Sequence, residues 1–270
     1  MQTLKAAFAR SPLPRLEQTM LWEYVLDVPR SWLIGHDTDV LPAEAVARYQ
    51  ALEARRLAGE PMAYIIGNRE FMGHAFTVGP GVLIPRPETE TLVEQALHIL
   101  TGMDHPRVLD LGTGSGAVAI SIALARPDAT VVATDFSAEA LHIATQNAHK
   151  LCAKVEFYQG SWYDAINGLA PFDVIVSNPP YIAENDPHLT QGDLRFEPAT
   201  ALSAAQNGLA DLQHIIAGAP SYLTNHGSIW LEHGWDQADS VRQLLSQAGF
   251  HDPISIPDLA GISRITGAYT

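Results

Sequence analysis

The fold is decided by one stretch, Val108-Leu109-Asp110-Leu111-Gly112-Thr113-Gly114-Ser115-Gly116. Its first four residues form a mainly apolar run that predicts a buried strand. The three alternating glycines allow the backbone to turn tightly and to approach a ligand closely. An apolar segment that runs to about Arg126 predicts a helix whose N-terminus faces that ligand. A strand, a glycine-rich loop and a helix in this order are typical of the first unit of a doubly wound α/β sheet.

The same alternation of strand and helix continues toward the C-terminus, which predicts a mainly parallel sheet. In such sheets ligands bind beyond the carboxyl ends of the strands, so we expect the functional residues in the loops that follow them. Further strands are predicted at residues 130–134, 155–158, 172–177 and 228–232, with helices at about 137–151, 209–223 and 237–248, and two short final strands near Ile254 and Ile265.

The part of the chain before this sheet has two kinds of sequence. Residues 1–70 place apolar side chains such as Leu16 and Met20 at helical spacing, which predicts a small helical bundle. Residues 71–87 mix apolar residues with glycine and proline, which predicts a β-hairpin that links two domains. We therefore expect a substrate-docking helical domain, a hairpin linker, and an α/β domain at residues 88–270.

Arg86 lies between two prolines, which fix the backbone on either side of it. Glu88 and Glu90 follow in the first turn of a predicted helix, where the helix dipole favours acidic side chains. The sequence leaves two interpretations of Arg86 open. Its side chain either faces the active site or forms a salt bridge with one of these two glutamates.

The glycine-rich loop is compatible with two cofactors. Gly112, Gly114 and Ala117 satisfy the dinucleotide pattern G-x-G-x-x-G/A, in which the helix N-terminus holds a pyrophosphate. The same helix end could instead hold the methionine carboxylate of S-adenosylmethionine. Asp135 follows the next strand, about 20 residues on, and its carboxylate suits a ribose diol in either case. The loop alone does not choose between the two cofactors.

A second motif, Asn178-Pro179-Pro180-Tyr181, follows the strand at 172–177. The two prolines end the strand and make the turn stiff. Asn178 offers a side-chain carbonyl, Pro179 a backbone carbonyl, and Tyr181 an aromatic face. A planar amino group carries two hydrogens to donate and a flat π face, so it fits this turn. The motif therefore favours methyl transfer to such a group over hydride transfer.

Composition narrows the class of protein. The chain has 270 residues, of which 47% are hydrophobic, and a net charge of −14, which disfavours direct binding to DNA or RNA. A single cysteine, Cys152, cannot form an internal disulfide. No apolar run reaches membrane-spanning length and the N-terminus lacks an apolar signal core, so we expect a cytoplasmic protein. The 11 histidines show no H-x-x-x-H spacing, and no metal site is predicted.

Taken together, these motifs resemble those of the HemK/PrmC family, whose members methylate peptide chain release factors on the glutamine of their Gly-Gly-Gln loop. The resemblance covers nearly the whole chain. It is carried by the glycine-rich loop, by residues 177–181 and by five further signatures: Ala63-Tyr64-Ile65-Ile66-Gly67, Leu83-Ile84-Pro85-Arg86-Pro87-Glu88-Thr89-Glu90, Arg195-Phe196-Glu197-Pro198, Leu231-Glu232-His233-Gly234 and Asp258-Leu259-Ala260-Gly261.

The resemblance implies a Rossmann-like, seven-stranded methyltransferase domain that uses S-adenosyl-L-methionine, and a release factor as the protein partner. It implies that Asn178, Pro179 and Tyr181 are catalytic and that these three residues and Pro180 bind the substrate. Asn178 and Pro179 would grip the glutamine amide, and Tyr181 would pack on it. The residues that it implies in cofactor binding are Gly112, Thr113, Gly114, Ser115, Gly116, Asp135, Trp162 and Asn178.

Three other functions remain as alternatives. An adenine-amino methyltransferase acting on DNA or RNA would use the same chemistry, although the acidic composition argues against it. A nicotinamide-dependent oxidoreductase is permitted by the glycine-rich loop. A binding module without activity would keep the fold, but it would not need the turn from Asn178 to Tyr181.

Overall fold

The computed structural model describes residues 2–270. Its internal contacts divide the chain into two compact units, one that ends at Gly67 and one that spans Asn68–Thr270. None of the helices found within residues 2–270 combines the length and the apolar character that a membrane-spanning helix needs.

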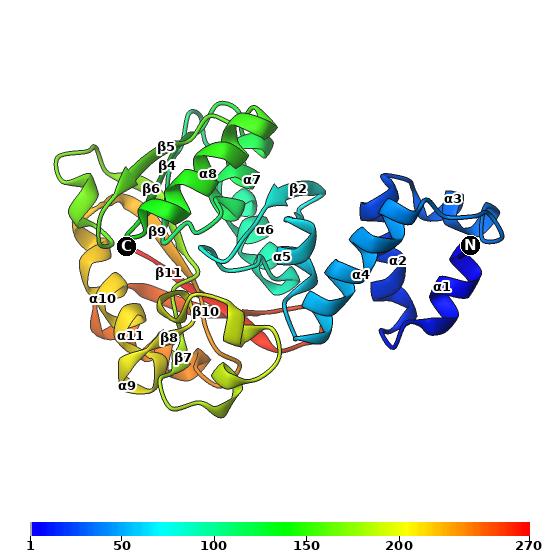
Figure 1. Cartoon of the computed structure of the whole chain (residues 1–270). Helices are drawn as coiled ribbons and strands as arrows, with labels where there is room; N and C mark the ends of the chain where they lie inside the picture. The colour runs from blue at the N-terminus through cyan, green and yellow to red at the C-terminus, as the bar shows by residue number, and fades with distance from the viewer. Residues whose placement is uncertain (1) are drawn as a thin grey trace. The chain divides into compact units, whose positions relative to one another are not determined.

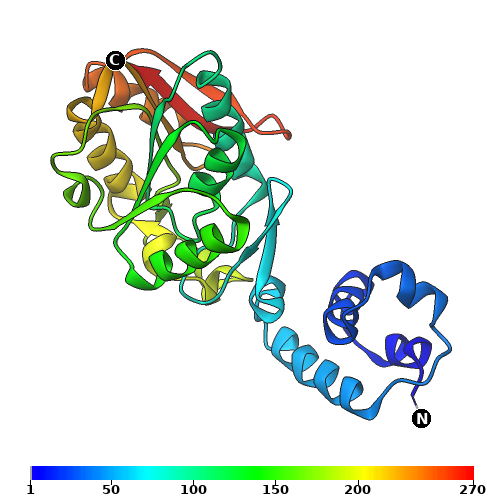
Figure 2. The ribbon, with the colours of Figure 1, turned by 90° about the horizontal axis from the view of Figure 1, so that it is seen from above.

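Within residues 2–67, the regular elements of the first unit are helices, which pack around their own core and are drawn in blue to light blue in Figure 2; an isolated β-bridge also joins Thr3 to Val40. Prolines precede four of the five helices, where their fixed φ angle suits a helix start. Trp22 and Tyr49 stack in the core, with ring centroids 4.2 Å apart. The helices are α1 (Leu4–Arg10), α2 (Arg15–Leu26), α3 (Arg30–Gly35), α4 (Ala43–Leu57) and α5 (Met62–Ile66).

A β-hairpin opens the second unit, and it lies earlier in the chain than the sequence indicated. Its strands are β1 (Asn68–Phe71) and β2 (His74–Thr77), whereas residues 78–86 form no strand. Met72 and Gly73 both have positive φ angles, as a two-residue hairpin turn requires. The prolines that follow lack backbone donors, which explains why the expected second half of the hairpin does not form.

A seven-stranded sheet forms the centre of the second unit, in the order β10-β11-β9-β6-β3-β4-β5. The five strands from β9 to β5 in this order are parallel, and β10 and β11 are antiparallel additions at one edge. The predicted α/β class with a mainly parallel sheet is therefore confirmed. The strands are β3 (Arg107–Leu111), β4 (Thr130–Asp135), β5 (Glu156–Gln159), β6 (Phe172–Ser177), β9 (Leu223–Glu232), β10 (His251–Pro257) and β11 (Ser263–Tyr269).

Helices cover both faces of this sheet (Figure 1). Alternate residues of a strand face opposite sides, so Val108 packs in one buried cluster and Leu109 in the other. The first cluster lies under α6 (Glu90–Ile99), α7 (Ala117–Ala125) and α8 (Ala138–Leu151); the second lies under α10 (Ala210–Gly218) and α11 (Ala238–Gln247).

The segment between β6 and α10 is longer than a simple strand-to-helix connection, and the sequence predicted no element in its first part. It contains the short parallel strands β7 (Ile182–Ala183) and β8 (Ser203–Ala204), which pair with each other, and the one-turn helix α9 (Ala205–Gly208). Three short 3-10 turns lie between β7 and β8. The two strands form a small sheet of their own, which begins directly after the Asn178 turn.

Candidate active site

A cavity of about 490 Å³ lies at the carboxyl ends of β3, β4, β5 and β6, where a doubly wound sheet places its ligands. This volume is in the range of cavities that hold small-molecule ligands. Most of the residues expected to bind the cofactor line this cavity. Those that line it are Gly112, Thr113, Gly114, Ser115, Asp135, Trp162 and Asn178.

Gly116 does not line the cavity, although the sequence grouped it with the cofactor loop. It precedes α7 with a φ angle of 81°. A Cβ atom at this position would lie 2.7 Å from Cδ1 of Ile120 and 3.2 Å from Cβ of Ala144. Gly116 therefore allows α7 and α8 to pack closely against the end of the loop, and its contacts are with protein atoms.

Asp135 lies at the end of β4 and faces the glycine-rich loop. Its Oδ2 atom accepts a hydrogen bond from the Gly114 N–H, and its Oδ1 atom accepts one from the Ser137 N–H, each at 2.8 Å. Each carboxylate oxygen can accept more than one hydrogen bond, so both retain capacity for the hydroxyls of a ribose diol. Burial raises the pKa of Asp135, and these backbone N–H groups oppose the shift.

Two aromatic side chains border the cavity beside Asp135. Trp162 packs against Gly112, where an added Cβ would lie only 3.3 Å from its ring, so Trp162 supports the loop as well as lining the cavity. Phe136 lines the cavity with 76% of its surface exposed. The sequence motifs did not single out Phe136. Phe136 directly follows Asp135 at the carboxyl end of a predicted strand, and this position could have indicated that it lines the site.

The charge of the lining separates the two cofactors that the loop permits. Among residues 2–270, those that line the cavity include no lysine, arginine or histidine, whereas four carry carboxyl groups: Asp110, Asp135, Glu139 and Asp211. Burial raises the pKa of Asp110 to about 7, so its negative charge is weakened near neutral pH. The other three carboxyl groups are better exposed to solvent than Asp110. An acidic wall disfavours a pyrophosphate and favours a ligand with cationic groups, such as the sulfonium and ammonium of S-adenosylmethionine. The residues present therefore fit that cofactor.

The Asn178 turn borders the same cavity. Asn178, Pro179 and Pro180 all line it directly after β6. The Asn178 side chain donates from Nδ2 to Oγ1 of Thr89 at 3.2 Å, so its Oδ1 atom points the other way and serves as an acceptor. Thr89 is 4% exposed and comes just before α6. In the sequence Thr89 belongs to one of the family signatures, but no local pattern gave it a role.

Tyr181 has a different position from its neighbours in the motif. Its hydroxyl donates to Oε1 of Glu232 at 3.2 Å, and its backbone carbonyl accepts from Nε2 of Gln237 at 3.0 Å. Tyr181 lines a smaller cavity of about 60 Å³, which shares Leu83, Asn178, Pro179 and Ala201 with the large one. The two cavities therefore meet at these four residues, of which Asn178 alone has a polar side chain.

Arg86 also lines the smaller cavity, and it forms a salt bridge with Glu197. Of the two interpretations that the sequence left open, a salt bridge with Glu88 or Glu90 is wrong, because the partner is Glu197. Glu90 accepts instead from the Met72 N–H in the hairpin turn. Glu197 is buried and also accepts from the Ile84 N–H at 3.0 Å, so it holds the chain on both sides of Pro85. A partner 111 residues away in sequence was not visible to a local pattern.

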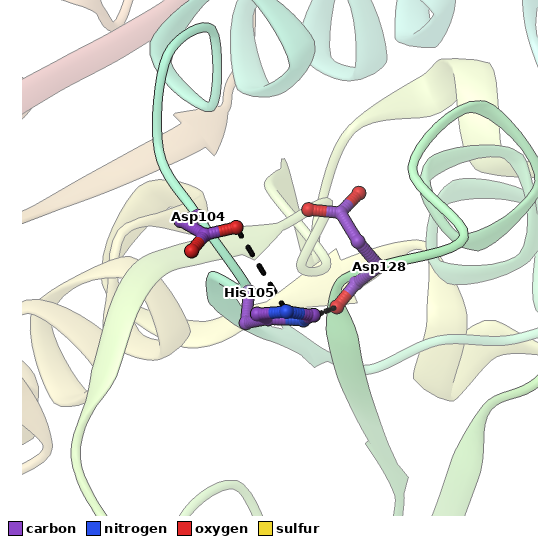
Figure 3. Close-up of side chains that lie close together, drawn as sticks. All are labelled: Asp104, His105 and Asp128. Carbon is purple, nitrogen blue, oxygen red and sulfur yellow. Dashed lines mark hydrogen bonds and ion pairs between the residues drawn. The ribbon is translucent and has the colours of Figure 1, made fainter.

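One group of possible cation ligands lies elsewhere, at the start of β3 rather than its end. Asp104, His105 and Asp128 lie close together on the surface (Figure 3). Both carboxylate oxygens of Asp128 already accept hydrogen bonds from Arg126, at 2.9 and 2.8 Å. An exposed acidic group with an arginine partner is an ordinary surface ion pair, and it is on the opposite edge of the sheet from the cavity.

Comparisons with known proteins agree with this geometry. A model of the PrmC N-terminal domain matches residues 1–67, and a model of the methyltransferase small domain matches residues 89–247. The release factor glutamine methyltransferase of Bordetella pertussis is 56% identical over 269 residues, which cover 100% of each chain. The chain belongs to the release factor glutamine methyltransferase family. The enzyme of the same name from Escherichia coli is 44% identical, with 95% of this chain and 92% of that one covered.

Solved structures show that this chain shares its fold with methyltransferases of other names. The T. Thermophilus 16S rRNA N2 G1207 methyltransferase, in complex with AdoMet and guanosine, matches with a TM-score of 0.56 and 20% identity, over 75% of this chain and 49% of that one. The hMettl16 catalytic domain matches with a TM-score of 0.57 and 15% identity, over 80% and 81%. At these identities the likeness concerns the fold alone.

Proposed function

We propose that this protein transfers a methyl group from S-adenosylmethionine to the side-chain amide nitrogen of the glutamine in the Gly-Gly-Gln motif of peptide chain release factors, and that it thereby modulates translation termination. The observation that carries the proposal is the junction of the two cavities at Asn178 and Pro179. Acceptor groups lie there beside an acid-lined cavity that fits the cofactor. The family to which the chain belongs supports the choice of acceptor.

When bound, S-adenosylmethionine supplies a methyl group on a positively charged sulfur. The residues of this chain orient the amide that receives it. Asn178 accepts one amide hydrogen through Oδ1, and the carbonyl of Pro179 accepts the other, so the nitrogen is directed toward the large cavity. Positive charge develops on the nitrogen as the new bond forms, and these two hydrogen bonds strengthen with it.

No strong base is required in this scheme. An amide nitrogen is a poor nucleophile because its lone pair is delocalised, so the barrier is lowered mainly by orientation, a term that can reach about 7–11 kcal/mol in well-aligned systems. The proton becomes acidic only after the methyl group has moved and then leaves to solvent. Tyr181 lines the small cavity; its hydroxyl donates to Glu232 and its backbone carbonyl accepts from Gln237.

The proposal also names a protein partner and a cellular compartment. The helical unit docks the release factor, and the net charge of −14 supports a protein partner over direct contact with nucleic acid. The protein acts in the cytoplasm, where its substrate is made. The single cysteine is consistent with that compartment.

Mass spectrometry of a purified release factor tests the proposal. After incubation with the protein and S-adenosylmethionine, the peptide that contains the Gly-Gly-Gln motif should gain the mass of one methylene group, located on the glutamine. The variant Asn178→Ala should bind the cofactor nearly normally in calorimetry and lose turnover. Parallel reactions with DNA and RNA test the adenine-amino alternative. Methyl transfer to either nucleic acid but not to the release factor would refute the proposal.

A further inference from the structure

A buried acid lies behind the Asn178 turn, and the proposed chemistry gives it no role beyond holding Tyr181. Glu232 ends β9, the strand next to β6 in the sheet, and is 1% exposed. Tyr181 donates to its Oε1 atom. Its Oε2 atom is buried and has no hydrogen-bond partner among residues 2–270. Burying a carboxyl oxygen without a hydrogen-bond partner costs free energy. We therefore looked for a role of Glu232 in the neighbouring site.

Thr89 interacts with both Asn178 and Glu232. Its Oγ1 atom accepts the hydrogen bond from Nδ2 of Asn178. Its hydroxyl is also near enough to the Glu232 carboxyl to lower the pKa of that group, although Oε2 of Glu232 makes no hydrogen bond of standard length and angle in the structure. A hydroxyl has a single hydrogen. While Oγ1 accepts from Asn178, that hydrogen is free to turn toward the neighbouring carboxylate.

We propose that Glu232 is a positioning residue that sets which end of the Asn178 amide faces the substrate. An ionised carboxylate can only accept, so when the Thr89 hydroxyl approaches Oε2 of Glu232 it donates its hydrogen there, and its oxygen accepts from Nδ2 of Asn178. This directs Oδ1 of Asn178 toward the junction of the cavities. The inference rests on the proposed function, because the orientation matters for an acceptor that offers an NH2 group.

A neutral group at position 232 removes this constraint. The Thr89 hydrogen can then turn toward Asn178, and the amide gains an alternative hydrogen-bonded orientation with Nδ2 toward the substrate. In that orientation two NH2 groups would face each other without an acceptor between them. The bound amide would no longer be aligned, although its binding surface would be unchanged in shape.

The charge on Glu232 changes near neutral pH. Burial raises its pKa to about 7, and Glu88 adds to the shift, whereas Thr89, Tyr181 and Arg264 oppose it. Burial and the same carboxylate also raise the pKa of Tyr181, so that its hydroxyl remains a donor. The productive orientation should therefore become more populated as the pH rises through about 7.

The test compares Glu232→Gln and Thr89→Val with Glu94→Gln, a matched change at an exposed glutamate of α6. Each of the first two variants should lower kcat by about tenfold, the effect of one hydrogen bond, with little change in KM for the release factor or in the affinity for S-adenosylmethionine. The rise of kcat with pH through about 7 should disappear in both. The double variant should lose no more than the more impaired single variant, since both act through one contact.

A second readout does not depend on methyl transfer. The side-chain amide resonances of Asn178, assigned in NMR spectra with the help of Asn178→Ala, should shift with a midpoint near pH 7 in the wild type and should not do so in Glu232→Gln or Thr89→Val. Resonances that stay constant between pH 6 and 8 in the wild type would overturn the inference, as would multiplying losses in the double variant. A wild type that shows the NMR transition but no methylation would refute only the proposed function.

Discussion

The carboxylate of Asp135 accepts a hydrogen bond from the Gly114 backbone N–H at 2.8 Å, which ties the end of β4 to the glycine-rich loop that follows β3. The acid expected to bind a ribose diol thus also holds the loop in the shape that surrounds the ligand. Bonds between a charged acceptor and a backbone N–H are worth about 1.5–3 kcal/mol. Removal of Asp135 should therefore disturb two things at once.

Asp135→Ala should lower the affinity for S-adenosylmethionine by at least about tenfold and also lower the stability of the protein without ligand by about 1–3 kcal/mol. Calorimetric titration and denaturant unfolding measure the two effects. Asp211→Ala, a carboxyl group from the same cavity wall, provides the control for loss of one negative charge. An Asp135→Ala protein with unchanged stability would show that the tether to Gly114 contributes nothing.

The pair formed by Arg86 and Glu197 should show coupled energetics. Burial raises the pKa of Glu197, and Arg86 lowers it by holding the charged form. Arg86→Ala leaves a buried carboxylate without its partner, so we expect a loss on the order of 2–4 kcal/mol in the free energy of unfolding at neutral pH. Arg86→Ala combined with Glu197→Gln should lose less than the sum of the two single changes. Strictly additive losses would contradict the coupling.

Gly208 should tolerate no side chain. A Cβ at this position would lie 1.9 Å from the carbonyl oxygen of Tyr181, and its φ angle is 82°. Gly168 has a similar φ angle of 87°, but a Cβ added there would meet no atom within 4 Å. Gly168→Ala should therefore cost only the left-handed backbone, about 1–2 kcal/mol. Gly208→Ala should cost clearly more and should also reduce methyl transfer, because it displaces the Asn178 turn. Equal thermal stabilities of the two variants would refute this explanation.

Asp110 should make stability depend on pH. Burial raises its pKa from 3.8 to about 7, so between about pH 4 and 7 the folded chain holds a proton that the unfolded chain has lost. The free energy of unfolding should then fall as the pH rises across this window, by up to about 4 kcal/mol. Asp110→Asn removes this contribution and should flatten the profile measured by denaturant unfolding, whereas Glu94→Gln should not. A wild-type stability that rises from pH 4 to 7 after subtraction of the Asp110→Asn profile would contradict the assignment.

The sequence was most informative where function depends on local pattern. The glycine-rich loop, Asp135 and the Asn178 turn each follow a predicted strand, and the parallel sheet brings the ends of those strands together. Their position on one cavity wall therefore follows from periodicity and from the rule that ligands bind at the carboxyl edge. The individual roles of these residues remain predictions that these variants test.

The features missed from the sequence depend on contacts between distant segments. Arg86 meets Glu197 across 111 residues, and Glu232 approaches Thr89 from a strand at the other end of the domain. Glu232 ends a predicted strand, where site residues are expected, but no local pattern indicates its approach to Thr89. The position of the hairpin was missed for the opposite reason: Met72, with its φ angle of 51°, is not a residue that usually marks a turn.

The order of the strands has a consequence for how acceptor choice can evolve. β3, β4 and β5 carry the loops that surround the proposed cofactor, whereas β6 and β9 carry Asn178 and Glu232. The two tasks meet at the end of β6, because Asn178 also lines the large cavity, and β9 lies beyond β6 in the sheet. Substitutions on β9 can therefore change which nucleophile is accepted, while the binding site for the methyl donor stays the same.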